Sequence, residues 1–133
     1  MGATTWRRLA SAGMLLVVLA GLALSLSGCG STSAAANAVE MGVADFQQHA
    51  VTIKAGQAVH FDDPANGGGT HIICIGKGQQ CVPQTGAPAE LNTASGITFN
   101  PGDPPQDIVF ATPGTYIVVC TIHPAMTVTI TVQ

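Results

Sequence analysis

Near its C-terminus the chain reads Cys120-Thr121-Ile122-His123-Pro124-Ala125-Met126. These seven residues contain a thiol, an imidazole and a thioether. A thiolate, two imidazoles and a weak axial thioether form the donor set of copper sites that transfer electrons. Cys120, His123 and Met126 are therefore the first candidate metal ligands. A second imidazole has to come from another part of the chain.

The residues on both sides of this segment predict two strands. Residues 115–119 and 127–132 are rich in Thr, Val and Ile, which favour strands, and Pro113-Gly114 is a turn signal before the first run. Two antiparallel strands hold the ends of a short loop at a fixed separation, and functional residues are often carried on such loops. We expect a hairpin whose connecting loop carries the candidate ligands.

The middle of the chain has the rhythm of an all-β protein. Over the whole chain only 8% of the residues are charged and 5% are aromatic, and in the middle short β-branched runs alternate with turn signals. Further strands are expected at residues 39–43, 51–54, 58–61, 70–75, 96–99 and 107–111. Residues 76–106 are otherwise irregular, and this length indicates either a surface cover or a functional loop.

The N-terminus predicts an export signal at residues 1–28. Arg7 and Arg8 precede an apolar run that extends to Leu26, the layout of a secretory signal peptide. The following Leu26-Ser27-Gly28-Cys29 resembles a bacterial lipobox, which implies cleavage before Cys29 and lipidation of that cysteine. An uncleaved membrane-spanning helix is the alternative. In both cases the domain lies outside the cytoplasmic membrane, and the first case anchors it there through the lipid on Cys29.

Residues 29–38 follow as a small, polar tether, which leaves residues 39–133 as one domain. Beyond the signal the chain has two basic residues, Lys54 and Lys77, against seven acidic ones, a net charge of −5. A domain with this charge is repelled by phosphate backbones, so no nucleic-acid partner is expected.

Three cysteines remain beyond Cys29, and an exported chain meets an oxidising compartment. Cys74 and Cys81 enclose two glycines that permit a tight return, so we predict that these two form a disulfide. Cys120 is then the free thiol. A disulfide from Cys120 to Cys74 or Cys81 stays open at this point, and it would abolish the metal site.

One early histidine followed by Cys-x-x-His-x-x-Met between the last two strands resembles the cupredoxins, the blue-copper proteins. The short spacing is most similar to the amicyanin and plastocyanin type, and Tyr116, four residues before Cys120, fits the same strand pattern. The resemblance covers residues 39–133 and implies a Greek-key β-sandwich with one type 1 copper ion. It also implies that the first imidazole starts a strand after a loop.

His71 is the residue in that place, since it follows Gly67-Gly68-Gly69-Thr70 and begins a hydrophobic run. His49 and His60 are rivals, but they lie just before and within other predicted strands. The expected ligands are thus His71, Cys120, His123 and Met126, with Ile72 and Ile122 next to them. Amicyanin-like loops commonly have proline where this chain has Ile122, so the Ile122 N–H is free to donate a hydrogen bond to the Cys120 sulfur.

These features predict a lipid-anchored, monomeric one-electron carrier, with redox protein partners that dock near His123. Zinc is disfavoured because a thioether is a poor zinc donor. Catalysis is not expected, because four side-chain ligands leave no open position for substrate. An extracytoplasmic copper chaperone or copper buffer is the main alternative, and a metal-free interaction module is a weaker one.

Overall fold

The computed structural model describes residues 36–133. The predicted signal peptide, Cys29 and most of the predicted tether lie outside the described residues. The described part contains nine strands, and no helix in it is long and apolar enough to cross a membrane. The strands are β1 (Ala38–Glu40), β2 (Ala50–Ile53), β3 (Gln57–Asp62), β4 (His71–Lys77), β5 (Gln80–Cys81), β6 (Ile97–Phe99), β7 (Gln106–Phe110), β8 (Gly114–Cys120) and β9 (Thr127–Val132).

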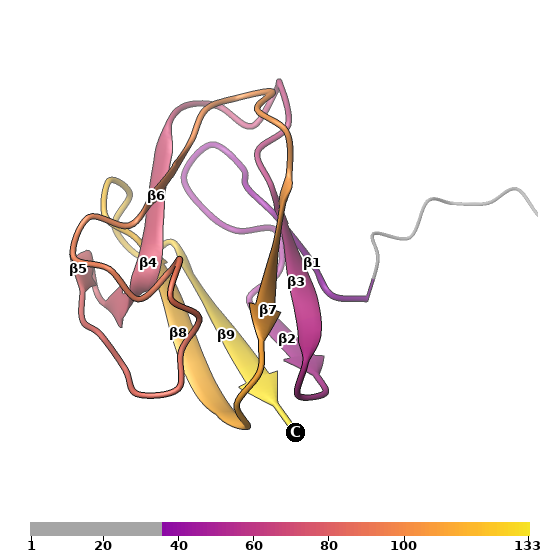
Figure 1. The fold of residues 1–133 in the computed structure, drawn as a ribbon. Helices are drawn as coiled ribbons and strands as arrows, with labels where there is room; N and C mark the ends of the chain where they lie inside the picture. Colours follow the sequence, from indigo (N-terminus) through magenta and orange to yellow (C-terminus); the bar gives the residue numbers. More distant parts are fainter. Residues whose placement is uncertain (1–35) are drawn as a thin grey trace, which may run out of the picture. The chain divides into compact units, whose positions relative to one another are not determined.

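The strands form two sheets (Figure 1). One sheet has the order β1-β3-β7, and the other has the order β2-β9-β8-β4-β5 with β6 paired to β4. β1 runs parallel to β3 and β2 runs parallel to β9, whereas the β8–β9 and β4–β8 pairs are antiparallel. The chain crosses between the sheets several times, so the predicted all-β Greek-key sandwich is confirmed.

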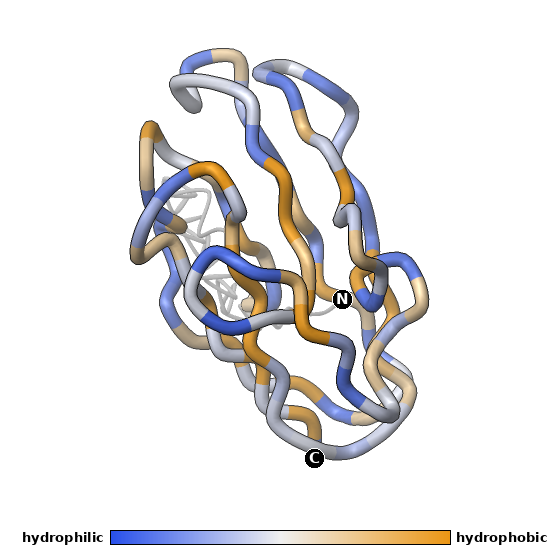
Figure 2. The backbone as a smooth tube through the Cα atoms, turned by 90° about the vertical axis from the view of Figure 1, so that its left-hand side faces the viewer, coloured by the Kyte–Doolittle hydropathy of each residue, from blue (hydrophilic) through white to orange (hydrophobic). Residues whose placement is uncertain are grey.

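Alternating side chains of the strands build the core between the sheets. Along β9 the buried residues are Val128, Ile130 and Val132, and the intervening threonines are partly exposed. This alternation is what one buried sheet face requires. In Figure 2 hydrophobic segments, drawn in orange, alternate with hydrophilic ones along the extended runs of the chain. Tyr116 is buried, and the carbonyl oxygens of Thr112 (2.9 Å) and Gly86 (3.1 Å) both lie within reach of its single hydroxyl hydrogen.

The irregular segment at residues 76–106 serves mainly as a cover for the core. Leu91 is fully buried, and its carbonyl oxygen accepts a 2.8 Å hydrogen bond from the Ile75 N–H. The predicted strand at residues 96–99 is present as β6, but the two-residue strand β5 was not predicted. The first strand is shorter than expected, because the Gly42 N–H turns back to the Asp45 carbonyl oxygen (2.8 Å).

Candidate metal centre

The predicted hairpin is present, and it carries the ligand loop at its end. β8 ends at Cys120 and β9 begins at Thr127, and the ladder between them reaches the pair Val119 and Thr127. The Cys120 N–H donates to the Met126 carbonyl oxygen (3.0 Å), which closes the loop at its base. Inside it the Met126 N–H donates to the His123 carbonyl oxygen (3.3 Å), and Ala125 has a left-handed φ of 69°. The loop is short and fixed at both ends.

His71 is the first residue of β4 and is placed there by the preceding glycines. β4 pairs with β8 so that Ile73 faces Cys120, two residues from His71 along the strand. Gly68 has a φ of 104°, and a Cβ there would lie 2.6 Å from the Cα of Val43. A Cβ on Gly67 would overlap the side chain of Asp63. Only glycine fits this close approach, which lets the loop lead the chain into the interior at His71.

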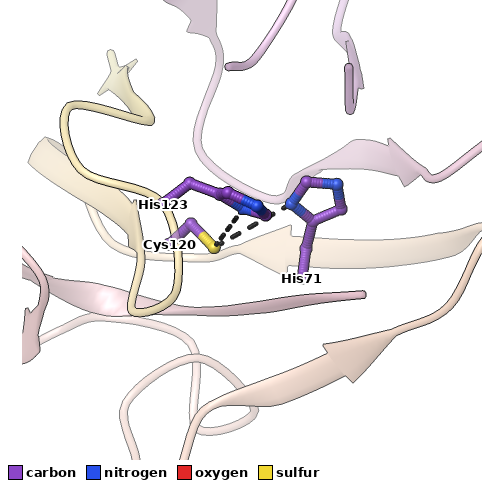
Figure 3. A group of neighbouring side chains, drawn as sticks. All are labelled: His71, Cys120 and His123. Carbon is purple, nitrogen blue, oxygen red and sulfur yellow. Dashed lines mark hydrogen bonds between the residues drawn. The ribbon is translucent and has the colours of Figure 1, made fainter. Parts of the chain in front are cut away.

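Three donor atoms converge in the space between β4 and the ligand loop (Figure 3). The Cys120 Sγ lies 3.9 Å from the His71 Nδ1 and 3.7 Å from the His123 Nδ1. All three donor atoms lie within 4.8 Å of one another. The two imidazole rings come from opposite sides, with centroids 4.8 Å apart and planes inclined by 50°. The chain thus brings together residues from positions 49 apart in the sequence.

These separations fit a single metal ion. An ion bonded to sulfur at about 2.3 Å and to nitrogen at about 2.0 Å, with about 120° between the bonds, separates the two donors by roughly 3.7 Å. The observed distances of 3.7 and 3.9 Å agree with this geometry. The site therefore brings together one thiol and two imidazoles, the donors that copper takes in electron-transfer proteins.

Met126 completes the ligand set from the end of the same loop. Its side chain is 1% exposed, and its carbonyl oxygen holds the Cys120 N–H. A thioether is a soft, weak donor that suits copper in the axial position and does not suit zinc. Together His71, Cys120, His123 and Met126 are the donor set of a copper site.

Burial keeps His71 in the form that a metal needs. The side chain is fully buried, and desolvation lowers the pKa of its imidazole, an effect that His123 reinforces and Asp63 opposes. The Gly42 backbone also raises the pKa of His71. No group forms a hydrogen bond of normal geometry with the His71 Nε2, so this nitrogen is buried without a partner. A neutral imidazole is the ligand form of histidine, so the metal-binding form prevails at neutral pH.

Asp63 is a buried acid that the sequence did not single out. Its side chain is fully buried and neither carboxylate oxygen has a hydrogen-bond partner. Burial raises the pKa of this carboxyl group, whereas the nearby His71 lowers it. The only signal in the sequence was its place just before the glycine-rich loop, which does not reveal burial.

The ligands differ in how far they reach the surface. His71 and Cys120 are fully buried, whereas His123 is partly exposed. Around His123, the side chain of Ile122 is 43% exposed and Pro124 and Ala125 are also exposed. Among residues 36–133, the ligand loop is thus where a candidate ligand, His123, reaches the surface.

The rival histidines lie away from this group. The His49 side chain is 67% exposed and lies 3.8 Å from Asp45. The His60 Nδ1 contacts the Asp107 carboxylate at 2.7 Å across the β3–β7 pair of the other sheet. Neither belongs to the cluster of potential metal ligands found within residues 36–133.

The cysteines divide as predicted. Cys74 and Cys81 form a disulfide, and Cys120 is a free, buried thiol. The alternative, in which Cys120 is oxidised to one of the other two, does not occur in the structure. The sulfur of Cys120 is therefore available for a metal.

Ile72 and Ile122, the residues predicted to lie next to the ligands, differ in the hydrogen bonds that they make. The carbonyl oxygen of Ile72 accepts a 2.8 Å hydrogen bond from the Thr121 N–H, which ties the ligand loop to β4 beside His71. The hydrogen bonds of the Cys120 sulfur are with the two imidazoles. A bond from the Ile122 N–H to this sulfur is not among them and stays a prediction.

Comparison with known proteins identifies the fold. Neither protein-family models nor curated protein sequences give a match to this chain. Among solved structures, amicyanin from Paracoccus versutus is 23% identical, with a TM-score of 0.52 over 75% of this chain and 83% of that chain. A Cu(I) form of an amicyanin mutant is 20% identical, with a TM-score of 0.52 over 74% of this chain and 82% of that one.

A mutant fern plastocyanin, solved in oxidised and reduced forms, is 28% identical. Its TM-score is 0.50 over 72% of this chain and 99% of the plastocyanin. The chain thus has the cupredoxin fold, and it holds the cupredoxin-like set of one cysteine, two histidines and one methionine. The resemblance expected from the Cys-x-x-His-x-x-Met loop is confirmed.

Proposed function

We propose that this chain is a blue-copper electron carrier that binds one copper ion through His71, Cys120, His123 and Met126. The observation that carries the proposal is the convergence of a free, buried thiol and two imidazole nitrogens at distances that fit one ion. The methionine in the same loop favours copper over zinc. When bound, copper supplies a Cu(II)/Cu(I) couple that takes up and releases one electron.

The protein's part is to hold the donors still and keep water away. Cys120 is fixed by the β4–β8 pairing and by its bond to the Met126 carbonyl oxygen, and His71 is fixed by its pairing with Phe99 of β6. Both side chains are fully buried. Donors that are positioned before an electron arrives need little rearrangement, which favours fast electron exchange.

Redox partners would dock at the end of the molecule where His123 reaches the surface. Ile122, Pro124 and Ala125 give this surface an apolar character. The surface around a single loop is small, and small contact areas are typical of weak, brief electron-transfer encounters. We propose that the protein acts as a monomer and meets its partners there.

The carrier function fits the burial of the site better than the chaperone function does. A chaperone has to hand its metal to a partner, which requires donors that the partner can reach. Here His71, Cys120 and Met126 are at most 1% exposed, and only His123 is accessible. The four donors also leave no ligand position for a substrate, which argues against an enzyme.

We further propose that the carrier is exported and anchored by lipid on Cys29 to the outer face of a membrane. The lipobox-like Leu26-Ser27-Gly28-Cys29 after an apolar run supports this location. In cells that make the full chain, a Cys29→Ser variant is expected to move from the membrane fraction to the soluble or unprocessed fraction. A Cys29→Ser variant that is still cleaved before position 29 and still found in the membrane fraction would contradict lipid anchoring.

A redox titration tests the proposed function. The copper-loaded full chain is expected to cycle reversibly between two states with a one-electron dependence on potential and to keep its copper throughout. A protein that gives up its copper to an accepting protein faster than it exchanges electrons would instead be a chaperone. Failure to bind copper would support the metal-free interaction module.

A further inference from the structure

The turn between β4 and β5 contacts the ligand loop directly. Gln79 lies in this turn, and its side-chain Nε2 donates to the carbonyl oxygens of Thr121 (3.3 Å) and Ile122 (3.2 Å). These two residues form the whole connection between Cys120 and His123. One amide nitrogen carries two hydrogens, so a single glutamine can serve both carbonyl groups.

The segment of Thr121 and Ile122 has a second anchor, at the start of β4. The Thr121 N–H donates to the Ile72 carbonyl oxygen (2.8 Å), next to His71. The backbone between the two ligands is thus fixed on one side by the start of β4 and on the other by the turn that follows β4. Two separate anchors leave the peptide groups of Thr121 and Ile122 little freedom.

The turn that carries Gln79 is itself rigid. The Cys74–Cys81 disulfide links the two strands of the β4–β5 hairpin, and the Val82 N–H donates to the Ile75 carbonyl oxygen (2.9 Å). A Cβ on Gly76 would overlap the Gln80 carbonyl oxygen and lie 2.8 Å from the Val119 Cγ2. The hairpin therefore packs tightly against β8, one residue before Cys120.

We propose that Gln79 is a positioning residue for the metal site, and that the disulfide-braced hairpin is its support. By holding the Thr121 and Ile122 carbonyl groups, Gln79 fixes where the chain places the His123 ring relative to the Cys120 sulfur. The proposal deepens the proposed function and rests on it only where copper is involved. Its effect on the loop exists without metal as well.

The first test uses the metal-free full chain. Hydrogen exchange at the Thr121 and Met126 amides, measured by NMR, reports how often the loop opens. For Gln79→Ala we expect roughly three- to tenfold faster exchange at these amides, the loss typical of one or two exposed hydrogen bonds. The matched control is Gln80→Ala, which removes a neighbouring exposed glutamine that has no hydrogen bond to the loop, and it should leave exchange unchanged.

A rescue variant separates the hydrogen bond from mere bulk. Gln79→Lys keeps a long side chain with a donor group, and it should retain most of the protection at Thr121 and Met126. Gln79→Glu has nearly the same shape but offers only acceptors when ionised, so it should behave like Gln79→Ala. Equal exchange in the original chain, Gln79→Ala and Gln79→Glu would overturn the proposal.

The second test uses the copper-loaded chain. With the loop loosened, His123 is held less firmly, and Cu(I) tolerates a weakened ligand better than Cu(II) does. Gln79→Ala should therefore raise the reduction potential and speed the loss of copper to a chelator by roughly three- to tenfold, whereas Gln80→Ala should change neither. A potential that is unchanged or lower in Gln79→Ala would contradict the proposal.

The two tests distinguish this proposal from the proposed function. If the chain binds no copper, the proposed function fails, yet the exchange measurement still decides whether Gln79 orders the loop. If copper binds normally and Gln79→Ala changes neither exchange nor potential, only the positioning role fails.

Discussion

The two imidazoles of the site are held in different ways, although both lie at a similar distance from the Cys120 sulfur. His71 belongs to a strand, is paired with Phe99 of β6 and is fully buried. His123 belongs to a loop and is partly exposed, and the two residues before it accept hydrogen bonds from the Gln79 side chain. The fold thus supplies one buried imidazole, His71, and one imidazole that reaches the surface, His123.

The largest expected effect comes from replacing either imidazole. We expect His71→Leu and His123→Leu each to abolish the thiolate–copper colour, because each removes one of the donors of the trigonal set. Their effects on the metal-free protein should differ. His71 buries an Nε2 without a partner, so the apolar side chain is expected to stabilise the fold by about 1 kcal/mol.

The control is His123→Leu, for which the free energy of unfolding should change by less than about 0.5 kcal/mol, since the side chain is partly exposed. Urea unfolding of the metal-free full chain measures both values. If His71→Leu is clearly less stable than His123→Leu, the buried His71 imidazole stabilises the metal-free fold, which would contradict this prediction.

Removing the Cys74–Cys81 disulfide tests how much the covalent link between β4 and β5 contributes to the free energy of unfolding. The double variant Cys74→Ser, Cys81→Ser opens a short covalent loop, and the chain-entropy relation gives a loss of about 2.5 kcal/mol in the free energy of unfolding. Thermal or urea unfolding with and without a reductant checks this value. The free energy of unfolding of the original protein in reductant should match that of the variant. If neither is lowered, the disulfide does not contribute to stability.

The glycine-rich loop before His71 should respond to a single methyl group. Gly68→Ala places a Cβ against the Val43 backbone at a positive φ, which we expect to cost about 2 kcal/mol in stability. Gly56→Ala is the matched control, because its φ is also positive but a Cβ there meets nothing within 4 Å. Only Gly68→Ala should also weaken copper binding. Equal effects of the two substitutions would mean that the close contact with Val43 does not place His71.

The smallest effect concerns the backbone of Ile122. Ile122→Pro removes an N–H that is free to donate to the Cys120 sulfur once it is a metal-bound thiolate, and the reduction potential should then fall. The decrease should be small, because the partners of this sulfur in the structure are the imidazoles. Protein-film voltammetry would measure the decrease in potential. An unchanged or higher potential would contradict the hydrogen bond from the Ile122 N–H to the Cys120 sulfur.

The sequence was informative wherever the chemistry was local. The Thr, Val and Ile alternation after Met126 predicts β9, and the Cys-x-x-His-x-x-Met spacing fits a loop that the β8–β9 ladder closes. His71 could be preferred over His49 and His60 because a glycine-rich segment precedes it, and the structure shows that Gly67 and Gly68 have no room for a side chain.

The sequence was silent where the structure depends on contacts between distant segments. Gln79 lies in an ordinary polar turn, and its bonds to Thr121 and Ile122 depend on the register of β4 against both β5 and β8. The two residues of β5 are too few to show a pattern. Asp63 looks like a turn residue, and only the packing of Gly67 over it reveals that it is buried.

The most direct test of the proposed copper site is the visible spectrum of the full chain after loading with Cu(II). Because Cys120 is the free thiol between two imidazoles, we predict an intense thiolate-to-copper charge-transfer band from one copper per chain, absent in Cys120→Ala and present in Cys74→Ser, Cys81→Ser. A copper-loaded chain without this band, or a band that survives in Cys120→Ala, would show that Cys120 does not bind copper between the two imidazoles.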